Sequence, residues 1–162
     1  MSEYGPDEYT LSNGDLLRIV PFEVWHAEAL AEDSLEGVLK PAPVRERAEF
    51  YLKMGPAYSG WIDGKLIGCA GIMIMWPGVG EAWIIFSEDV LQYKKDAYVV
   101  ILDYLRAIIS KLHLRRIQAH CHSALPHGQK YLEQLGFECE GKLKKYGIDG
   151  ADHYLYAMIT GD

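Results

Sequence analysis

A short polar turn at residues 92–97 carries side chains that suit a bound phosphate group. An apolar run at 81–86 precedes the turn, and a long amphipathic stretch at 98–112 follows it. A strand that enters a helix through a turn brings unpaired backbone N–H groups and the positive end of the helix dipole to one point. We therefore predict an anion site formed by Gln92, Tyr93, Lys94, Lys95, Asp96 and Ala97.

The segments before this turn are predicted to form strands and two short helices. Hydrophobic spacing and turn residues give strands at 16–22, 58–62, 65–75 and 81–86 and helices at 24–35 and 42–54. Asp63 and Gly64 separate two β-rich runs, and both residue types tolerate positive φ, which favours a hairpin there. The strands around this turn should form an antiparallel meander.

The segments after the turn are predicted to form a crossover and a final hairpin. Apolar residues recur at helical spacing in 98–112, so this helix should lie on the sheet. The run 115–122 alternates as a strand, and strand, helix and strand in this order imply parallel pairing. The remaining expected elements are a helix, its left-handed cap and a closing hairpin, at 127–135, Gly136, 137–146 and 153–159.

Length and composition fit one α/β (α+β) domain. The 162 residues are 49% hydrophobic and 24% charged, as in globular proteins that bury a core of their own. We predict a flexible lead-in at 1–15 and a single domain at 16–162. Its mixed, mostly antiparallel sheet should hold about seven strands, flanked by about four helices.

Charge and cysteine content limit the partners and the compartment. A net charge of −7 without a basic cluster disfavours nucleic acid and anionic membranes and fits a cationic or amine-bearing partner better. Cys69, Cys121 and Cys139 form no CxxC pair, so we expect them to be reduced and buried. The N-terminus lacks signal-peptide features and no run approaches ~18 apolar residues, which predicts a cytoplasmic protein.

The most specific motif lies near the C-terminus. Residues 131–137 read Tyr-Leu-Glu-Gln-Leu-Gly-Phe, and Glu138, Glu140, Gly141 and Leu143 follow. This segment and the order of elements between Leu16 and Ile159 resemble the GNAT superfamily of acyl-CoA-dependent N-acetyltransferases. The resemblance implies a GNAT-like fold and acetyl-CoA as co-substrate.

The resemblance also assigns the turn at 92–97 to the coenzyme A diphosphate. The family's loop reads Gln/Arg-x-x-Gly-x-Gly/Ala, and Gln92 and Ala97 fit it, whereas Lys95 stands where the first glycine is expected. In one interpretation, Lys94 and Lys95 replace backbone contacts by charge. In the other, the loop has lost its cofactor and the lysines only begin a solvated helix. Such divergent loops are similar to those of acetyltransferase-like proteins encoded by phages.

The strand at 81–86 supplies further candidates through the same resemblance. In the family, the equivalent strand offers backbone N–H groups to the thioester carbonyl, which here implies Ile85, Phe86 and Ser87. A carboxylate on that strand often acts as the base, and Glu81 matches such a position. Glu81 equally fits an exposed charge at a strand start. Trp83 stands where a second acidic residue is expected and is a weaker candidate on the substrate side.

Tyr131 is the candidate acid. The family commonly uses a tyrosine of the short helix to protonate the departing thiolate, but here Leu132 occupies that position and Tyr131 precedes it. A shift of one residue turns a side chain about 100° around a helix. Tyr131 therefore also fits a packing residue that pairs with Leu135.

Three histidines raise the question of a metal. His120 and His122 share one face of the strand at 115–122, and His127 follows. Zinc normally needs a third and a fourth protein ligand, and no fourth ligand is suitably spaced. We therefore predict no metal and place His122 at the substrate side of the pocket.

Acyl transfer from a thioester to an amine requires a neutral amine, a closely held electrophile and relief of developing charge. The resemblance implies an N-acyltransferase that moves an acetyl or other acyl group from acyl-CoA to a primary amine by direct attack. The acceptor would be a small molecule or a protein, and the enzyme a monomer or homodimer. The alternative is a catalytically inactive GNAT-like binding or structural protein with a degenerate coenzyme A loop.

Overall fold

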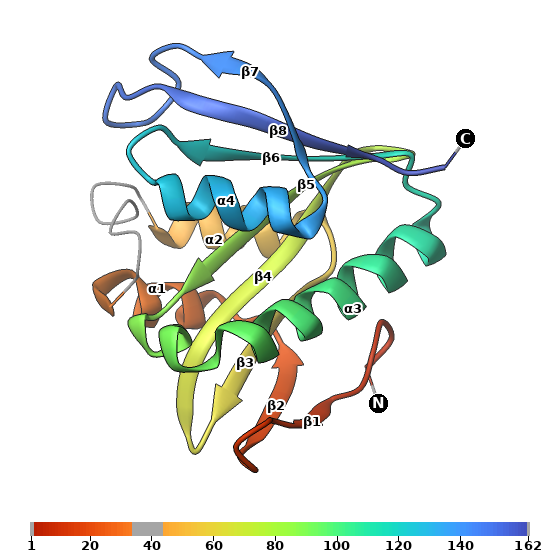
Figure 1. Ribbon diagram of the computed structural model, residues 1–162, viewed down its shortest axis with the longest axis vertical. Helices are drawn as coiled ribbons and strands as arrows, with labels where there is room; N and C mark the ends of the chain where they lie inside the picture. Colours follow the sequence, from red (N-terminus) through yellow and green to blue (C-terminus); the bar gives the residue numbers. More distant parts are fainter. Residues whose placement is uncertain (1, 34–43, 162) are drawn as a thin grey trace.

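The computed structural model describes residues 2–33 and 44–161, and its centre is one eight-stranded mixed sheet (Figure 1). In spatial order the strands are β1 (Glu8–Thr10), β2 (Leu16–Pro21), β3 (Ala57–Ile62), β4 (Lys65–Trp76), β5 (Val79–Phe86), β6 (Arg116–His122), β8 (His153–Ile159) and β7 (Glu138–Leu143). All neighbouring pairs are antiparallel except β5 and β6, which are parallel. This confirms the predicted mixed, mostly antiparallel sheet.

Helices cover both faces of the sheet (Figure 1). On one face lie α1 (Val24–Asp33) and α2 (Val44–Met54), and on the other lie α3 (Lys94–Leu112) and α4 (Pro126–Leu135). The apolar stripe of α3 packs on the larger core, which includes Leu105, Ile108 and Ile117. A smaller core with Phe22, Ala48 and other side chains lies under α1 and α2. The predicted helix ends at 35 and 42 fall outside the described residues.

Two turns follow from their residue types. At the β3–β4 hairpin, Asp63 and Gly64 have φ of 50° and 73°, as the sequence predicts. Gly136 ends α4 with φ of 105°, and its N–H and that of Phe137 bond back to the last turn of the helix.

The N-terminal segment differs from the predicted flexible lead-in. Strand β1 pairs with β2, and the side chains of Tyr4 and Leu11 are buried in the larger core. The Tyr104 hydroxyl donates to the carbonyl oxygen of Pro6 at 2.6 Å, and Lys111 bonds the carbonyl of Glu3. Residues 2–15 therefore add an edge strand to the sheet and packing to the core.

Two smaller expectations also change. The turn at 92–97 is largely helical, because the 3₁₀ helix η1 (Glu88–Tyr93) leads directly into α3. Cys139 is exposed on β7, whereas Cys69 and Cys121 are buried as predicted. β7 is the last strand of the sheet, and all of its residues except Leu143 are exposed.

Candidate active site

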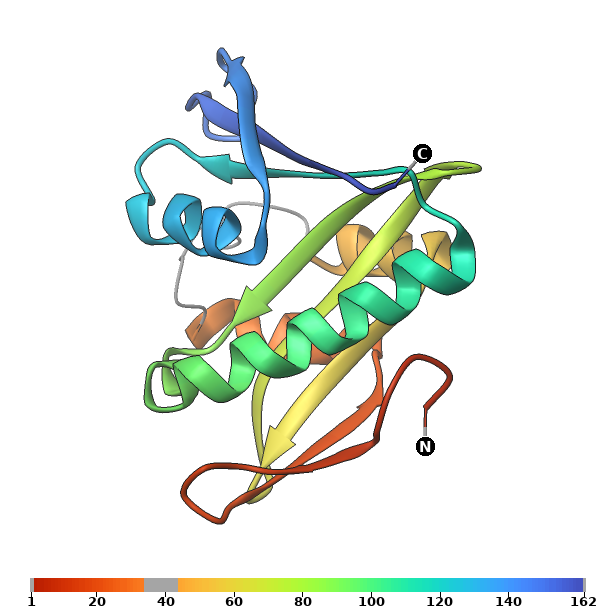
Figure 2. The same cartoon turned by 45° about the vertical axis from the view of Figure 1, so that its right-hand side comes forward.

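The central feature of the site is a wedge between β5 and β6. These strands pair only at Val79–Arg116, Gly80–Ile117 and Glu81–Gln118. Beyond Glu81 they run apart, and Figures 1 and 2 both show the opening, with α4 beside it. A parallel pair that opens in mid-sheet leaves backbone hydrogen-bonding groups of both strands free for a ligand.

The pairing of β5 with β4 decides which backbone groups face the wedge. The Ser87 N–H donates to the Ile67 carbonyl of β4 at 2.9 Å. Because N–H groups in an antiparallel strand point alternately to its two neighbours, the N–H of Ile85 also faces β4. The N–H groups of Ile84 and Phe86 face the wedge. Of the predicted backbone donors, the register therefore turns the N–H of Phe86 to the wedge and those of Ile85 and Ser87 to β4, and it adds Ile84 as a candidate.

The predicted phosphate turn places two lysines at the start of α3. The side chains of Lys94 and Lys95 are exposed, and neither has a carboxylate within 4 Å among the residues that the structure describes. Lys95 lies in the first turn of a right-handed helix and has no positive φ. The backbone here therefore does not require the conformational freedom of glycine, although glycine would still allow a closer approach.

Two other members of that turn point away from an anion. The Asp96 carboxylate accepts hydrogen bonds from the backbone N–H and the hydroxyl of Ser12 at 3.3 and 3.0 Å. The Tyr93 hydroxyl donates to Asp15 at 3.1 Å. Both side chains thus attach the N-terminal segment to α3. The backbone of the first helical turn, Gln92, Lys94 and Lys95 remain as the candidates for binding an anion.

Tyr131 lies at the wedge on the α3 and α4 side of the sheet. Its ring meets the ring of Phe86 edge to face, with centroids 5.9 Å apart. Its hydroxyl is buried and has no hydrogen-bond partner among the described residues. Burial raises the pKa of Tyr131 above its usual range, so the phenol keeps its proton. A buried hydroxyl without a partner has an unmet bond to offer a ligand in the wedge.

Glu81 and Trp83 project to the opposite face of the sheet, below α2. One carboxylate oxygen of Glu81 accepts a hydrogen bond from the side-chain amide of Gln118 at 3.0 Å. This contact joins the last paired residues of β5 and β6 across the start of the wedge. Trp83 packs between Phe22 and Tyr51, and its ring stacks on Tyr51 at 4.2 Å.

A row of histidines continues this face along β6 and β8. The Nδ1 atoms of His120 and His153 are 2.8 Å apart, so one must donate and the other accept. Burial, followed by the charge of Arg47, lowers the pKa of His120, and burial with the neighbouring histidines lowers that of His153. The pair is therefore neutral near pH 7. The exposed ring of Tyr146 covers both imidazoles.

Both ring nitrogens of His122, the residue predicted at the substrate side, form hydrogen bonds within the protein. Its Nδ1 accepts the Ala124 N–H at 3.0 Å, so the neutral ring carries its proton on Nε2 and donates to Asp149 at 2.9 Å. This bond lowers the pKa of Asp149. His122 thereby fixes the β7–β8 loop, and both of its nitrogens are occupied. Among the described residues, no group of three or more His, Cys, Asp or Glu side chains is arranged to hold a metal.

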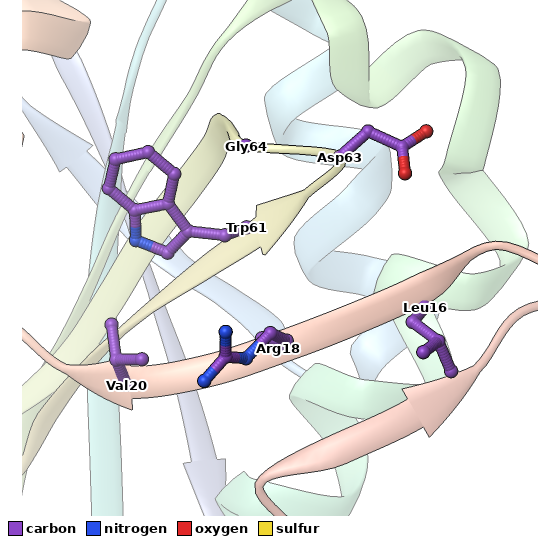
Figure 3. Close-up of a pocket in the computed structure, with 6 residues that line it drawn as sticks. All are labelled: Leu16, Arg18, Val20, Trp61, Asp63 and Gly64. Atoms are coloured by element: carbon purple, nitrogen blue, oxygen red, sulfur yellow. The ribbon is translucent and has the colours of Figure 1, made fainter.

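A separate hollow lies away from the wedge, on β2 and β3 at the hairpin turn (Figure 3). It is lined by Leu16, Arg18, Val20, Trp61, Asp63 and Gly64. The close-up shows the Asp63 carboxylate directed away from the Arg18 guanidinium. The hollow contains none of the predicted site residues.

Solved structures share this architecture. An acetyltransferase of the GNAT family from Bacillus anthracis aligns with 88% of this chain and 94% of its own, at 22% identity and a TM-score of 0.67. The chain has the GNAT acetyltransferase fold. A spermidine N-acetyltransferase SpeG variant from Vibrio cholerae gives a TM-score of 0.68 at 18% identity, over 88% of this chain and 93% of that one. No protein-family model and no curated protein matches the sequence.

A GNAT structure with bound coenzyme A is also similar. The ribosomal L7/L12 α-N-protein acetyltransferase RimL, in complex with coenzyme A, aligns at a TM-score of 0.65 and 14% identity, over 88% of this chain and 93% of that one. These likenesses confirm the GNAT-like fold that the sequence resemblance implies. No helix in the described ranges of the chain has the length and apolar character to cross a membrane.

Sequence reasoning missed Arg47 and Tyr51 on α2. They are four residues apart and so share one face of the helix, on the side of Glu81 and Trp83. The available signal was an aromatic and a basic residue at that spacing in an otherwise polar helix.

Proposed function

We propose that this protein transfers an acetyl or related acyl group from acyl-CoA to a primary amine, at the wedge between β5 and β6. The observation that supports the proposal most is the end of β5–β6 pairing at Glu81 and Gln118. On one side of this opening lie the start of α3 and the unpartnered Tyr131 hydroxyl, and on the other lies the Glu81 carboxylate. Groups for a cofactor and for an amine thus meet at one break in the sheet.

The residues present suit coenzyme A. The first turn of α3 with Lys94 and Lys95 would hold the diphosphate through charge and backbone N–H groups. The N–H groups of Ile84 and Phe86 face the place where the extended part of the cofactor would enter the wedge. Acetyl-CoA, when bound, supplies a thioester that an amine can attack without a covalent enzyme intermediate.

Each remaining group has a separate task in this proposal. The Phe86 N–H donates to the carbonyl oxygen as negative charge develops on it. Glu81, held by Gln118, accepts a proton from the attacking amine, directly or through water. Tyr131 donates its proton to the departing thiolate. Glu81, the proton acceptor, and Tyr131, the proton donor, lie on opposite faces of the sheet, so each serves a different side of the wedge.

The test is an assay of thiol release from acetyl-CoA with a panel of primary amines, with mass spectrometry of the acetylated products. We expect amine-dependent release by the parent protein and a loss of at least about tenfold in kcat for Glu81→Gln. Glu88→Gln, an exposed carboxylate of η1, is the matched control and should keep the parent rate. Coenzyme A binding without any amine-dependent release would instead support the inactive binding protein.

A further inference from the structure

Arg47 is a cation on the amine side of the wedge with no anion to balance it. It lies on α2 and is partly buried. No carboxylate of the described residues comes within 4 Å of its guanidinium, whereas Arg45 on the same helix pairs with Glu49 at 3.4 Å. A guanidinium carries five donors in a planar fork, and this geometry suits carboxylate and phosphate oxygens.

The neighbours of Arg47 place its charge at the wedge. Tyr51 lies one helical turn further along α2 and stacks on Trp83 of β5. Besides burial, the positive charge of Arg47 helps to lower the pKa of His120 of β6 and of His153 of β8. It also counters the raised pKa of Tyr146 in the β7–β8 loop. The guanidinium therefore lies near residues of β6, β8 and the β7–β8 loop, on the Glu81 side of the sheet.

A buried donor without a partner lies in the same region. The indole Nε1–H of Trp83 is buried and has no hydrogen-bond partner among the described residues. This group can only donate, and leaving such a buried donor unpaired is unfavourable. Arg47 and Trp83 both adjoin Tyr51, and Arg47 bonds its hydroxyl. A guanidinium has further N–H donors, so an oxygen acceptor there could bind Arg47 and the indole N–H together.

Glu81 supplies the opposite charge. Besides burial, its carboxylate helps to raise the pKa of Tyr51 and of Tyr146, whereas Arg47 lowers the pKa of both. Glu81 nevertheless forms no ion pair with Arg47 within 4 Å. The other titratable groups nearby are His120, His122, His153 and Asp149, and Asp149 is bonded to His122. One cation and one anion thus lie near the same two tyrosines without pairing with each other.

We propose that the acceptor is an amine that also carries an oxyanion, such as a free amino acid, with Arg47 and Trp83 binding the oxyanion while Glu81 receives the amine. This inference rests on the proposed acyl transfer. The proposed acceptor differs from the cationic acceptor that the net charge of −7 suggests. A guanidinium without a paired carboxylate in the site affects binding there more than the distant, screened charges of the surface do.

The experiment compares matched acceptors that differ only in the anion. L-phenylalanine is paired with L-phenylalaninamide, and O-phosphoethanolamine with ethanolamine, so that carboxylate and phosphate are distinguished. We expect kcat/KM to favour one anionic member by about 10–100-fold, since hydrogen bonds to charged groups contribute about 1.5–3 kcal/mol. Arg47→Gln should abolish that preference, Arg47→Lys should restore part of it, and Arg45→Gln should leave it unchanged.

A second readout separates this inference from the proposed transfer. The melting temperature is measured with N-acetyl-L-phenylalanine and with its carboxamide, for the parent and Arg47→Gln, in the presence of coenzyme A. A larger shift with the carboxylate, lost in Arg47→Gln, supports the inference even if no acetylation occurs and the proposed transfer fails. Equal use of anionic and neutral amines, or an unchanged preference in Arg47→Gln, would overturn the inference while leaving acyl transfer intact.

Discussion

At the scale of single residues, Tyr131 shows how far a shift of one position matters. The sequence places Tyr131 one residue before the position that the family resemblance implies, which leaves its direction open. The structure turns its ring onto Phe86 at the wedge and leaves its hydroxyl buried without a partner. An unpaired buried hydroxyl lowers the free energy of unfolding, and a ligand that bonds this hydroxyl would offset that cost.

Tyr131→Phe should therefore separate stability from activity. The free energy of unfolding should stay the same or rise by about 1 kcal/mol, because an unsatisfied buried hydroxyl is removed. The kcat of transfer should fall at least about tenfold, since the thiolate loses its proton donor. Chemical denaturation and thiol-release kinetics measure the two effects.

The matched control is Tyr9→Phe, whose hydroxyl bonds Asp103 far from the wedge. It should leave kcat unchanged. A Tyr131→Phe variant that is less stable and fully active would show that Tyr131 is only a packing residue.

The neutral pair of His120 and His153 predicts how stability depends on pH. Both residues have a pKa below the ordinary 6.5 in the folded state, so the unfolded chain binds more protons as the pH falls below 6.5. The free energy of unfolding should thus be highest above about pH 7 and fall as the pH drops through 6.5 and then through the folded pKa values.

In His120→Gln this dependence should be weaker, while His127→Gln, an exposed histidine of α4, should keep the parent slope. His26, which is buried and also has a lowered pKa, accounts for the part that remains. Thermal melts from about pH 5 to about pH 8 measure the slope. Equal slopes for the parent and His120→Gln would show that the pair is not held neutral.

At the scale of elements, the start of α3 carries the cofactor proposal. Lys95 stands on a right-handed helical turn, and the Asp96 carboxylate beside it bonds Ser12. Two cations and one anion therefore share the helix end that would meet a diphosphate.

Changing these charges should move coenzyme A affinity in opposite directions. Lys95→Gln should weaken binding about 3–10-fold at low salt and reduce its salt dependence, because one screened ion contact is lost. Asp96→Asn should strengthen binding while lowering the free energy of unfolding by about 0.5–1 kcal/mol through the weaker link to Ser12. Calorimetric titration at two salt concentrations measures both, with exposed Lys130→Gln on α4 as the control. Tighter binding by Lys95→Gln would show that Lys95 obstructs the site.

The sequence predicted elements better than it predicted their junctions. The stripe of α3, the Asp63–Gly64 hairpin and the Gly136 cap depend on neighbouring residues, so periodicity and turn chemistry sufficed. The direction of the N–H groups of Ile85 and Ser87 could not be predicted, because it depends on which residue of β4 lies opposite. The residues that surround Arg47 and Trp83 likewise depend on how α2 packs against the sheet.

At the scale of the whole molecule, the function proposed here depends on one interrupted strand pair. Cores on both faces hold the two halves of the sheet, and the N-terminal segment extends one of them through β1 and the buried side chains of Tyr4 and Leu11. The sequence identifies β5 and β6 as parallel neighbours, but the length of their pairing is set by the packing of distant elements. The residues at which the pairing ends were therefore visible only in the structure.

Coenzyme A binding to the intact protein tests the central claim most directly. The melting temperature is followed as acetyl-CoA is added, with Lys95→Gln measured in parallel. A ligand that binds only the folded state at a hundred times its Kd adds about 2.7 kcal/mol, which for a chain of this size corresponds to a rise of about 5–11 °C. We predict such a saturable rise for the parent and a smaller one for the variant at equal concentration. An unchanged melting temperature in millimolar acetyl-CoA would contradict the account.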